Sequence, residues 1–327
     1  MIISRTPFRV SFVGGGSDID SFYREKPGAV VSTTIDKYMY VTINERFDDT
    51  IRVAYTKTEI VDSVDEIRHD LVREAMRKVG IDGGLEVTTI ADVPAGTGLG
   101  SSSSLTVGLL RAFYAYRGMF KDKEELAKEA CEIEIDVLDK PIGKQDQYAA
   151  SFGGLNYIEF YPDETVSVEP IVIDSKLREE FEDNLLLFYT GETRDADEIL
   201  DQQKSDTEGS EENMAKLSQM VEFAGETMGF LEDGQFGDVG DLLHENWLLK
   251  QDLSAKISNS ELETTYKLAR EAGAKGGKVL GAGGGGFFLF YCDSDEQDNL
   301  RKTLAKNGFE ETSFKFENEG SKIIYAE

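Results

Sequence analysis

Apolar and polar positions change their spacing several times along the first half of the chain, and these changes predict a mixture of strands and helices. Short runs rich in β-branched and aromatic residues predict strands, and stretches with apolar residues three and four apart predict helices. The predicted strands cover residues 9–13, 29–35, 38–43, 51–55, 85–90 and 155–160. The predicted helices cover residues 66–79, 105–116, 123–138 and 145–152.

Helical spacing dominates the second half, where residues 195–231 are largely helical with an acidic turn near 206–212. Further helices are predicted at 241–257 and 261–272, and a pattern similar to a capping box at 294–297 opens a last one. Strands are predicted at 184–189, 278–280, 287–291, 312–316 and 322–325. The whole pattern predicts an α+β protein with two lobes, residues 1–175 and 176–327.

Composition and charge narrow the classes of function. The 327 residues are 40% hydrophobic and 30% charged, which is enough for a sizeable core. Acidic residues number 63 and basic residues 35, a net charge of −28. This charge argues against a nucleic-acid or anionic-membrane binder, because phosphate contacts need clustered lysines and arginines. An anionic ligand would have to be bound locally, by backbone N–H groups, a metal or a few placed cations.

The cysteines and histidines exclude several kinds of site. Cys131 and Cys292 form no C-x-x-C pair, so a thiol redox motif and a zinc ribbon are not supported. Only two histidines occur, which argues against a histidine-rich metal centre and a histidine-driven nucleophile. No signal peptide or apolar run long enough to span a bilayer is evident. We expect a cytoplasmic enzyme with free thiols.

A glycine-serine loop between a predicted strand and a predicted helix is the first candidate for chemistry. Its glycines allow unusual backbone angles, and the helix directs free N–H groups at the loop, an arrangement that binds anions. It is not a Walker A loop, because no Gly-Lys-Ser/Thr follows. An ordinary helix cap with a flexible approach remains the alternative. The candidate phosphate-binding residues are Pro94, Gly96, Gly98, Leu99, Gly100, Ser101, Ser102 and Ser103.

Two carboxylates are further candidates. On a helical wheel Glu134 falls in the middle of an apolar arc, where a carboxylate is costly unless it is paired or binds a metal. It could also lie at the edge of the arc and extend to solvent. Asp146 follows Gly143 and Lys144 at a predicted helix start, where it could be a simple cap.

Two more glycine runs fail the test for a dinucleotide site. Residues 281–286 formally fit G-x-G-x-x-G, but a strand follows instead of the helix that a Rossmann fold needs. The run at residues 14–16 lacks the third glycine. Either run could be only a tight hairpin.

The order of these glycine motifs resembles the GHMP small-molecule kinase superfamily. The central loop is similar to that family's P-x-x-x-G-L-G-S-S phosphate loop, with Ser103 and Ser104 where alanines are usual, and residues 281–286 resemble its third motif. The resemblance spans nearly the whole chain. It implies ATP as a substrate, a ribosomal-protein-S5-like N-terminal lobe and a ferredoxin-like C-terminal lobe, with the site between them.

The resemblance also implies roles for individual residues. Ser102 and Glu134 would hold Mg²⁺, Asp146 would contact the acceptor hydroxyl, and Arg9 would neutralise charge beside it. Residues 9–18 are similar to the R-V-N-L-I-G-E-H-T-D signature of galactokinases, and Arg9 and Asp18 match it. Gly15 and Gly16 replace the Glu and His, which argues against galactose.

Within the superfamily, residues 5–9, 14–18, 143–148 and 319–324 resemble the D-glycero-D-manno-heptose 7-phosphate kinases. This likeness implies transfer from ATP to the anomeric hydroxyl of the heptose 7-phosphate, giving the 1,7-bisphosphate for nucleotide-activated heptose and surface glycans. The expected substrate-binding residues are Gly15, Gly16, Ser17, Asp18, Lys144, Arg194, Gly283 and Gly284. The candidate cations for a 7-phosphate are Arg24, Lys37, Lys144 and Arg194, although each could be a plain surface charge.

Two alternatives remain open at this point. The chain could phosphorylate an unphosphorylated sugar such as fucose, galactose or a uronic acid, or it could be a non-catalytic sugar and nucleotide sensor with the same fold. The expected partners are ATP and a small sugar phosphate, without nucleic acid or membrane. The oligomeric state is left open, a homo-oligomer included.

Overall fold

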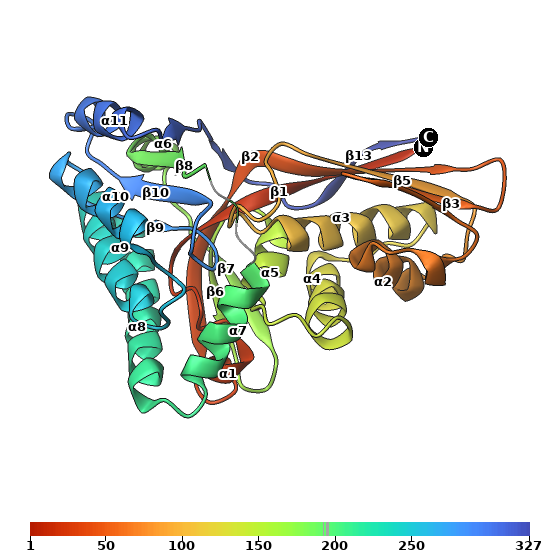
Figure 1. Ribbon diagram of the computed structural model, residues 1–327, viewed down its shortest axis with the longest axis horizontal. Helices are drawn as coiled ribbons and strands as arrows, with labels where there is room; N and C mark the ends of the chain where they lie inside the picture. The colour runs from red at the N-terminus through yellow and green to blue at the C-terminus, as the bar shows by residue number, and fades with distance from the viewer. Residues whose placement is uncertain (192, 194–195) are drawn as a thin grey trace.

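The computed structural model describes residues 1–191, 193 and 196–327, and Figure 1 shows them arranged around two β-sheets. The elements of the first half are β1 (Ile2–Val13), α1 (Asp20–Tyr23), β2 (Gly28–Glu45), β3 (Ile51–Ala54), β4 (Thr58–Val61), the 3₁₀ turn η1 (Val64–Glu66), α2 (Asp70–Val79), β5 (Leu85–Ala91), α3 (Ser101–Tyr116), α4 (Lys123–Cys131), the π-helical turn η2 (Glu132–Val137), α5 (Gln145–Phe152), β6 (Leu155–Phe160) and β7 (Val166–Pro170).

The second half is mostly helical, as its sequence pattern predicts. Its elements are α6 (Ser175–Asp183), β8 (Leu185–Tyr189), α7 (Ala196–Thr207), α8 (Glu211–Asp233), α9 (Phe236–Gln251), α10 (Ser260–Glu271), β9 (Gly276–Val279), β10 (Phe287–Tyr291), α11 (Gln297–Lys306), β11 (Glu310–Glu311), β12 (Phe316–Glu317) and β13 (Lys322–Ala326). The predicted α+β class is confirmed.

The long strand β2 organises the larger sheet. Its first part, from Gly28, pairs with β6, and its last part, to Glu45, pairs with β5, while β1 runs antiparallel along almost its whole length. The sequence predicted two strands here, at 29–35 and 38–43. They are one strand because the backbone stays extended through residues 36–37, where β1 shifts its register between Pro7 and Phe8.

The larger sheet has the strand order β13-β1-β2-β5-β3-β4, and β6, β7 and β12 attach to it through β2 and β6. Helix α3 packs on β1 and β2, and α2, α4 and α5 pack around α3 (Figure 1). This position explains why α3 is buried almost all round. It begins at Ser101, four residues earlier than predicted, and the hydroxyl of Ser104 donates to the Pro7 carbonyl at 2.9 Å.

The smaller sheet is antiparallel with the order β11-β8-β10-β9, and helices α8 and α9 pack together beside it. The chain then returns to the larger sheet, since β12 pairs with β2 and β13 pairs with β1. The capping box predicted at 294–297 is wrong. Helix α11 exists, but its N-cap is Glu296, whose side chain makes no cap hydrogen bond.

The predicted helix 123–138 is divided. α4 ends at Cys131, and the chain continues as the π-helical turn η2, which contains Glu134. Such single turns of wider helix occur frequently at functional sites. Among the residues that the structure describes, none of the helices is both long enough and apolar enough to cross a membrane.

Candidate active site

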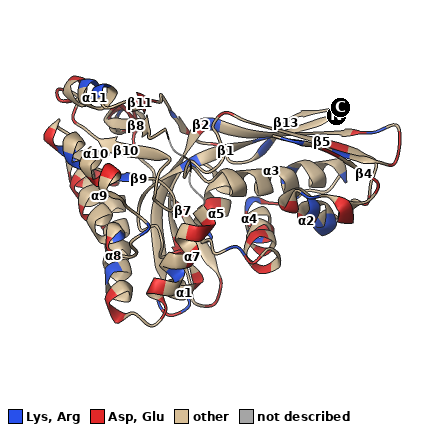
Figure 2. Cartoon of the chain, viewed as in Figure 1, with Lys and Arg blue, Asp and Glu red and all other residues tan. Residues whose placement is uncertain are grey.

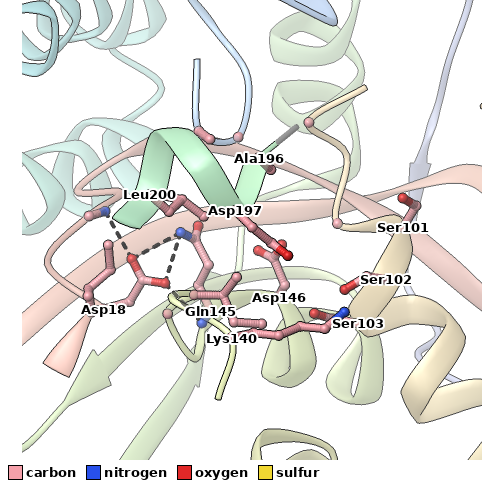
Figure 3. Close-up of a pocket in the computed structure, with 18 of the residues that line it drawn as sticks. Asp18, Ser101, Ser102, Ser103, Lys140, Gln145, Asp146, Ala196, Asp197 and Leu200 are labelled. Atoms are coloured by element: carbon pink, nitrogen blue, oxygen red, sulfur yellow. Dashed lines mark hydrogen bonds between the residues drawn. The ribbon is translucent and has the colours of Figure 1, made fainter. Parts of the chain in front are cut away.

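A cavity of about 310 Å³ lies where both halves of the chain meet. Its walls come from the end of β1, the loop before α3, the start of α5, the helices α7 and α9, and the loop after β9. In the view of Figure 3, Asp146 lies between Asp18 and Gln145 on one side and the serines of α3 on the other. The residues that line the cavity thus come from segments as far apart in the sequence as Arg9 and Ala282.

The glycine-serine loop forms one wall. Gly96, Gly98 and Gly100 all have positive φ angles, of 76°, 81° and 76°, in the left-handed region that favours glycine. Gly100 is the N-cap of α3, so the first N–H groups of this helix face the loop and the cavity. The arrangement has the geometry of an anion-binding helix start. The predicted phosphate-binding residues that line the cavity are Gly96, Gly98, Gly100, Ser101, Ser102 and Ser103.

The two remaining residues of that predicted set support the loop from behind. The Pro94 carbonyl accepts a hydrogen bond from the hydroxyl of Thr97 at 2.9 Å. Leu99 is buried at 1% exposure, and its carbonyl accepts from the backbone N–H of Arg9 at 3.1 Å. The loop is therefore fixed to the start of the chain as well as to α3.

The glycine run at residues 281–286, the late glycine loop, packs directly against the glycine-serine loop at residues 94–103, the proposed phosphate loop. A Cβ atom on Gly98 would lie 2.4 Å from the Leu280 carbonyl oxygen, and one on Gly281 would lie 2.6 Å from the Gly98 Cα. Two backbones this close leave no room for side chains. Gly281 and Ala282 line the cavity, whereas the predicted residues Gly283 and Gly284 face Ile257, whose carbonyl accepts from the Gly284 N–H at 2.8 Å.

Arg9 and Asp146 form a bidentate ion pair at the centre of the site. Arg9 Nε donates to Asp146 Oδ1 at 2.7 Å, and Arg9 Nη2 donates to Asp146 Oδ2 at 2.8 Å. Arg9 Nη1 donates to the Gly98 carbonyl. The Arg9 side chain is 5% exposed and that of Asp146 is 22% exposed, so the carboxylate is the member of the pair that a ligand can reach.

Glu134 lies beside the first turn of α3. It is fully buried, and its Oε2 accepts from the hydroxyls of Ser102 and Ser103 at 3.0 and 3.1 Å. Burial raises the pKa of Glu134, and the hydroxyl of Thr106, the charge of Lys140 and the two serine hydroxyls oppose that effect. The alternatives of a solvent-exposed carboxylate and of a direct ion pair with Lys or Arg do not describe this geometry.

The surroundings of Glu134 fit a bound cation. Its Oε1 is buried and has no hydrogen-bond partner among the described residues. A buried carboxylate oxygen without a partner is costly, and a divalent metal would satisfy it. Ser102 offers a hydroxyl oxygen beside it and also lines the cavity. Mg²⁺ suits such a site, because it binds few protein oxygens and takes phosphate oxygens and waters besides.

Asp18 and Gln145 form the opposite end of the cavity. Asp18 is 2% exposed, and its carboxylate accepts from the Gly16 N–H and from both the backbone and the side chain of Gln145 (Figure 3). Burial raises the pKa of Asp18, and the nearby Asp146 adds to that effect. Gly16 and Asp18, which are two of the residues predicted to bind substrate, line the cavity.

The other predicted residues of this glycine run, Gly15 and Ser17, are not among the residues that line the cavity. A Cβ on Gly15 would lie 3.7 Å from both Gln145 Nε2 and Lys250 Nζ. The hydroxyl of Ser17 donates to the carbonyls of Gly14 and Ala29, which holds the loop on β2.

Three of the four cations expected to bind an acceptor phosphate lie outside the cavity. Lys144 donates a hydrogen bond to Glu164, and its ammonium lies over the ring of Tyr23. It is not one of the described residues that line the cavity. Arg24 also pairs with Glu164, and Lys37 pairs with its neighbour Asp36. Arg194 lies outside the described residues.

Several residues of the cavity escaped the sequence analysis, foremost Lys140, Gln203 and Lys250. Figure 3 shows Lys140 beside the serines of α3, and α7 contributes Asp197, Leu200 and the buried Gln203. No local motif marks these positions. Lys140 lies just beyond the predicted helix 123–138 and Lys250 lies within the predicted helix 241–257, positions at which a lysine is ordinarily a surface residue.

Comparison with known proteins gives the site a context. Residues 67–154 match the GHMP kinases N terminal domain, and residues 227–310 match the GHMP kinases C terminal domain. The D-glycero-alpha-D-manno-heptose 7-phosphate kinase of Campylobacter jejuni is 34% identical over 98% of both chains. A D-glycero-D-manno-heptose 1-phosphate kinase structure from Bacteroides thetaiotaomicron is 28% identical and superposes with a TM-score of 0.82, with both chains covered completely.

A third similarity is to a larger protein. The bifunctional fucokinase/GDP-fucose pyrophosphorylase of Arabidopsis thaliana is 27% identical over 92% of this chain, which spans 31% of that protein.

Proposed function

Because this chain belongs to the GHMP kinases, we propose that it transfers the γ-phosphoryl group of ATP to the anomeric hydroxyl of D-glycero-D-manno-heptose 7-phosphate. The product would be the 1,7-bisphosphate, a precursor for nucleotide-activated heptose. The chain is a sugar kinase, a phosphotransferase with an alcohol group as acceptor. The similarity to two heptose phosphate kinases over nearly the whole chain supports the proposed acceptor.

One observation carries the proposal: the glycine-serine loop, the Arg9–Asp146 pair and Ser102, whose hydroxyl is bonded to the buried Glu134, line the same cavity. Phosphoryl transfer needs alignment and charge neutralisation more than covalent help. The loop amides and the first turn of α3 would hold the nucleotide phosphates. Binding of the phosphates by backbone N–H groups suits a chain of net charge −28, because it needs few basic side chains.

Ser102 and Glu134 would hold Mg²⁺ through the serine hydroxyl and the unpartnered Oε1 of the glutamate. The ion, when bound, would neutralise charge on the β- and γ-phosphates. Glu134 is rigidly placed for this task, because the π-helical turn directs it at the start of α3, where two hydroxyls orient it.

Asp146 would accept a hydrogen bond from the anomeric hydroxyl and then its proton. The sugar oxygen forms a bond to the γ-phosphorus, while the bond from that phosphorus to the bridging oxygen breaks and ADP keeps the electron pair. Arg9 holds both oxygens of Asp146 and the Gly98 carbonyl, so it fixes the carboxylate relative to the phosphate loop. Asp18 and Gln145 would bind other hydroxyls of the sugar.

The two cysteines agree with a reducing compartment. Cys131 and Cys292 are both buried and free. We place the reaction in the cytoplasm, where ATP is available and thiols stay reduced.

Turnover with a panel of acceptors tests the proposal. The purified protein is given ATP, Mg²⁺ and one acceptor at a time: the heptose 7-phosphate, the same heptose without its phosphate, fucose, galactose and glucuronic acid. ADP release measures turnover, and phosphorus NMR locates the new phosphate. We expect the highest kcat/KM with the heptose 7-phosphate and a new signal from an anomeric phosphate.

The Asp146→Asn variant serves as the background, since it reports any contaminating kinase. Turnover confined to unphosphorylated sugars would contradict the proposed acceptor. Binding of sugar and nucleotide without ADP release for every acceptor would contradict the proposed phosphoryl transfer and favour the sensor.

A further inference from the structure

A buried lysine of α9 faces the cavity from the C-terminal half. Lys250 is 3% exposed, and its Nζ donates to the Gly281 carbonyl at 2.9 Å. Among the described residues, the cations that line the cavity are Arg9, Lys140 and Lys250. Arg9 is bonded to Asp146 and Gly98 through all three of its nitrogens, so its donors are largely committed. Among the described residues, Lys250 makes one side-chain hydrogen bond, to the Gly281 carbonyl, so its ammonium keeps donor capacity for a ligand.

Its position is set by the contact between the two glycine loops. Gly281, which binds the Lys250 ammonium, packs against Gly98 so closely that a Cβ would lie 2.6 Å from the Gly98 Cα. The Gly98 carbonyl in turn accepts from Arg9, the partner of Asp146. The ammonium therefore lies near the junction of the phosphate loop and the Arg9–Asp146 pair, close to where nucleotide and acceptor must meet.

The charges around Lys250 favour the entry of an anion. The charged groups that face it are Arg9 on β1, Asp18 in the loop after β1, Asp146 on α5 and Lys278 on β9. Three cations and two carboxylates, when all are charged, leave one positive charge in excess. Lys278 is 1% exposed and donates to the Ser11 hydroxyl at 3.3 Å, and no carboxylate among the described residues forms an ion pair with it.

A buried excess of positive charge is unfavourable until an anion balances it. Burial lowers the pKa of Lys250 to about 8, with Asp18 opposing that effect, and burial and Lys250 together lower the pKa of Lys278. An entering phosphoryl group would favour the charged form of both lysines. The cluster is therefore suited to a group that carries its negative charge into the middle of the cavity.

We propose that Lys250 is a further catalytic residue, whose ammonium contacts the phosphoryl group as it passes from the nucleotide to the acceptor. The inference rests on the proposed phosphoryl transfer, but not on which sugar accepts. The phosphate already present on a heptose 7-phosphate is a less suitable partner. It is separated from the anomeric hydroxyl by the length of the sugar, whereas Lys250 lies near the pair that binds this hydroxyl.

Two substitutions test the role of Lys250. Lys250→Met keeps the length of the side chain and removes the charge, and Lys250→Arg keeps the charge. We expect Lys250→Met to lower kcat by about 10²–10³-fold, the loss typical of a removed transition-state donor, with little change in the KM of either substrate. Lys267→Met is the matched control, since Lys267 is 80% exposed on α10. A raised KM for phosphorylated acceptors alone, with kcat unchanged, would overturn the proposal.

The pH profile separates a catalytic ammonium from a structural one. The contact needs the protonated form, so kcat/KM of the unmodified enzyme, which reports the free enzyme, should fall as pH rises through the Lys250 pKa of about 8. In Lys250→Arg this fall should disappear, because a guanidinium stays protonated throughout. An alkaline limb that stays in place in Lys250→Arg would contradict the proposal.

A binding experiment makes the inference independent of the acceptor. Calorimetry compares ADP alone with ADP plus Mg²⁺ and aluminium fluoride, which imitates the group in transfer. We expect Lys250→Met to bind ADP as the unmodified protein does and to lose at least 10-fold in affinity for the fluoride complex. Equal losses for both ligands, or none, would overturn the role of Lys250. If the heptose 7-phosphate gave no ADP release in the acceptor panel, that result would contradict the proposed substrate but not the role of Lys250.

Discussion

Arg9 and Asp146 lie 137 positions apart in the sequence, and two parallel hydrogen bonds of 2.7 and 2.8 Å join them. The same guanidinium donates to the Gly98 carbonyl in the phosphate loop. One side chain therefore sets the position of the Asp146 carboxylate relative to the loop that we propose to bind the nucleotide. Because in-line transfer depends on this alignment, the ion pair has a geometric task as well as an electrostatic one.

Arg9→Lys tests the geometric task, because it keeps the positive charge and removes the planar guanidinium that donates to several oxygens at once. A single ammonium cannot hold two carboxylate oxygens and a carbonyl in a fixed plane. We expect kcat to fall about 10²-fold, the cost of a misplacement near 1 Å, with the fold retained by circular dichroism. Arg5→Lys is the control on the same strand, since Arg5 pairs with Glu317 instead. Equal kcat in Arg9→Lys and the control would contradict a geometric role for Arg9.

Asp146→Asn tests the carboxylate itself. The amide keeps the shape and can still bind Arg9 through its oxygen, but it is a poor proton acceptor. We expect kcat to fall by about 10²–10⁴-fold, the range for loss of a general base, and the melting temperature to stay within a few degrees. Asp136→Asn, at an exposed position of η2, should leave kcat unchanged. Near-normal turnover in Asp146→Asn would remove the assigned role.

Glu134→Gln tests metal binding. The glutamine keeps the serine contacts but is a weaker ligand, so the Mg²⁺ concentration for half-maximal activity should rise about 10-fold or more. Mg²⁺ titrations at fixed ATP measure this. The fold should not suffer, because burial raises the pKa of Glu134 and a neutral amide avoids that cost.

Glu132→Gln is the matched control for this variant. Glu132 belongs to the same turn but pairs with Lys78 at the surface. An identical Mg²⁺ requirement in Glu134→Gln, Glu132→Gln and the unmodified enzyme would count against metal ligation.

The predictable part of the site is the part with local patterns. The glycine-serine loop could be predicted from the sequence, because glycine spacing and a following helix are features of adjacent residues. The burial of Glu134 could be predicted because a helical wheel places it among apolar neighbours. The wheel could not predict that α4 gives way to a π-helical turn at this point, since that depends on packing against α2 and α3.

The rest of the site depends on contacts between distant segments. Lys250 reads as an ordinary basic residue in the last turn of α9, and only its bond to Gly281, 31 positions further, shows it to be a buried group of the cavity. Lys144 is the opposite case. Its place in the Asp146 loop suggested a ligand contact, but Glu164 and the ring of Tyr23 hold its side chain elsewhere.

The contact between Gly98 and the late glycine loop gives the last prediction. Gly98 has a φ of +81°, and a Cβ there would lie 2.4 Å from the Leu280 carbonyl oxygen, so Gly98→Ala must both strain the backbone and separate the two loops. The strain alone costs about 1–3 kcal/mol. Gly118→Ala measures the cost of the backbone strain alone, since Gly118 has a φ of +66° and open space around it.

Both variants should lose stability in urea unfolding, but only Gly98→Ala should also weaken nucleotide binding, by at least 10-fold in the Kd for ADP. The reason is that the Gly98 carbonyl accepts a hydrogen bond from Arg9 and that the amides of this loop are the groups proposed to bind the nucleotide phosphates. Equal Kd values for the two variants would show that the close approach of the loops serves stability alone.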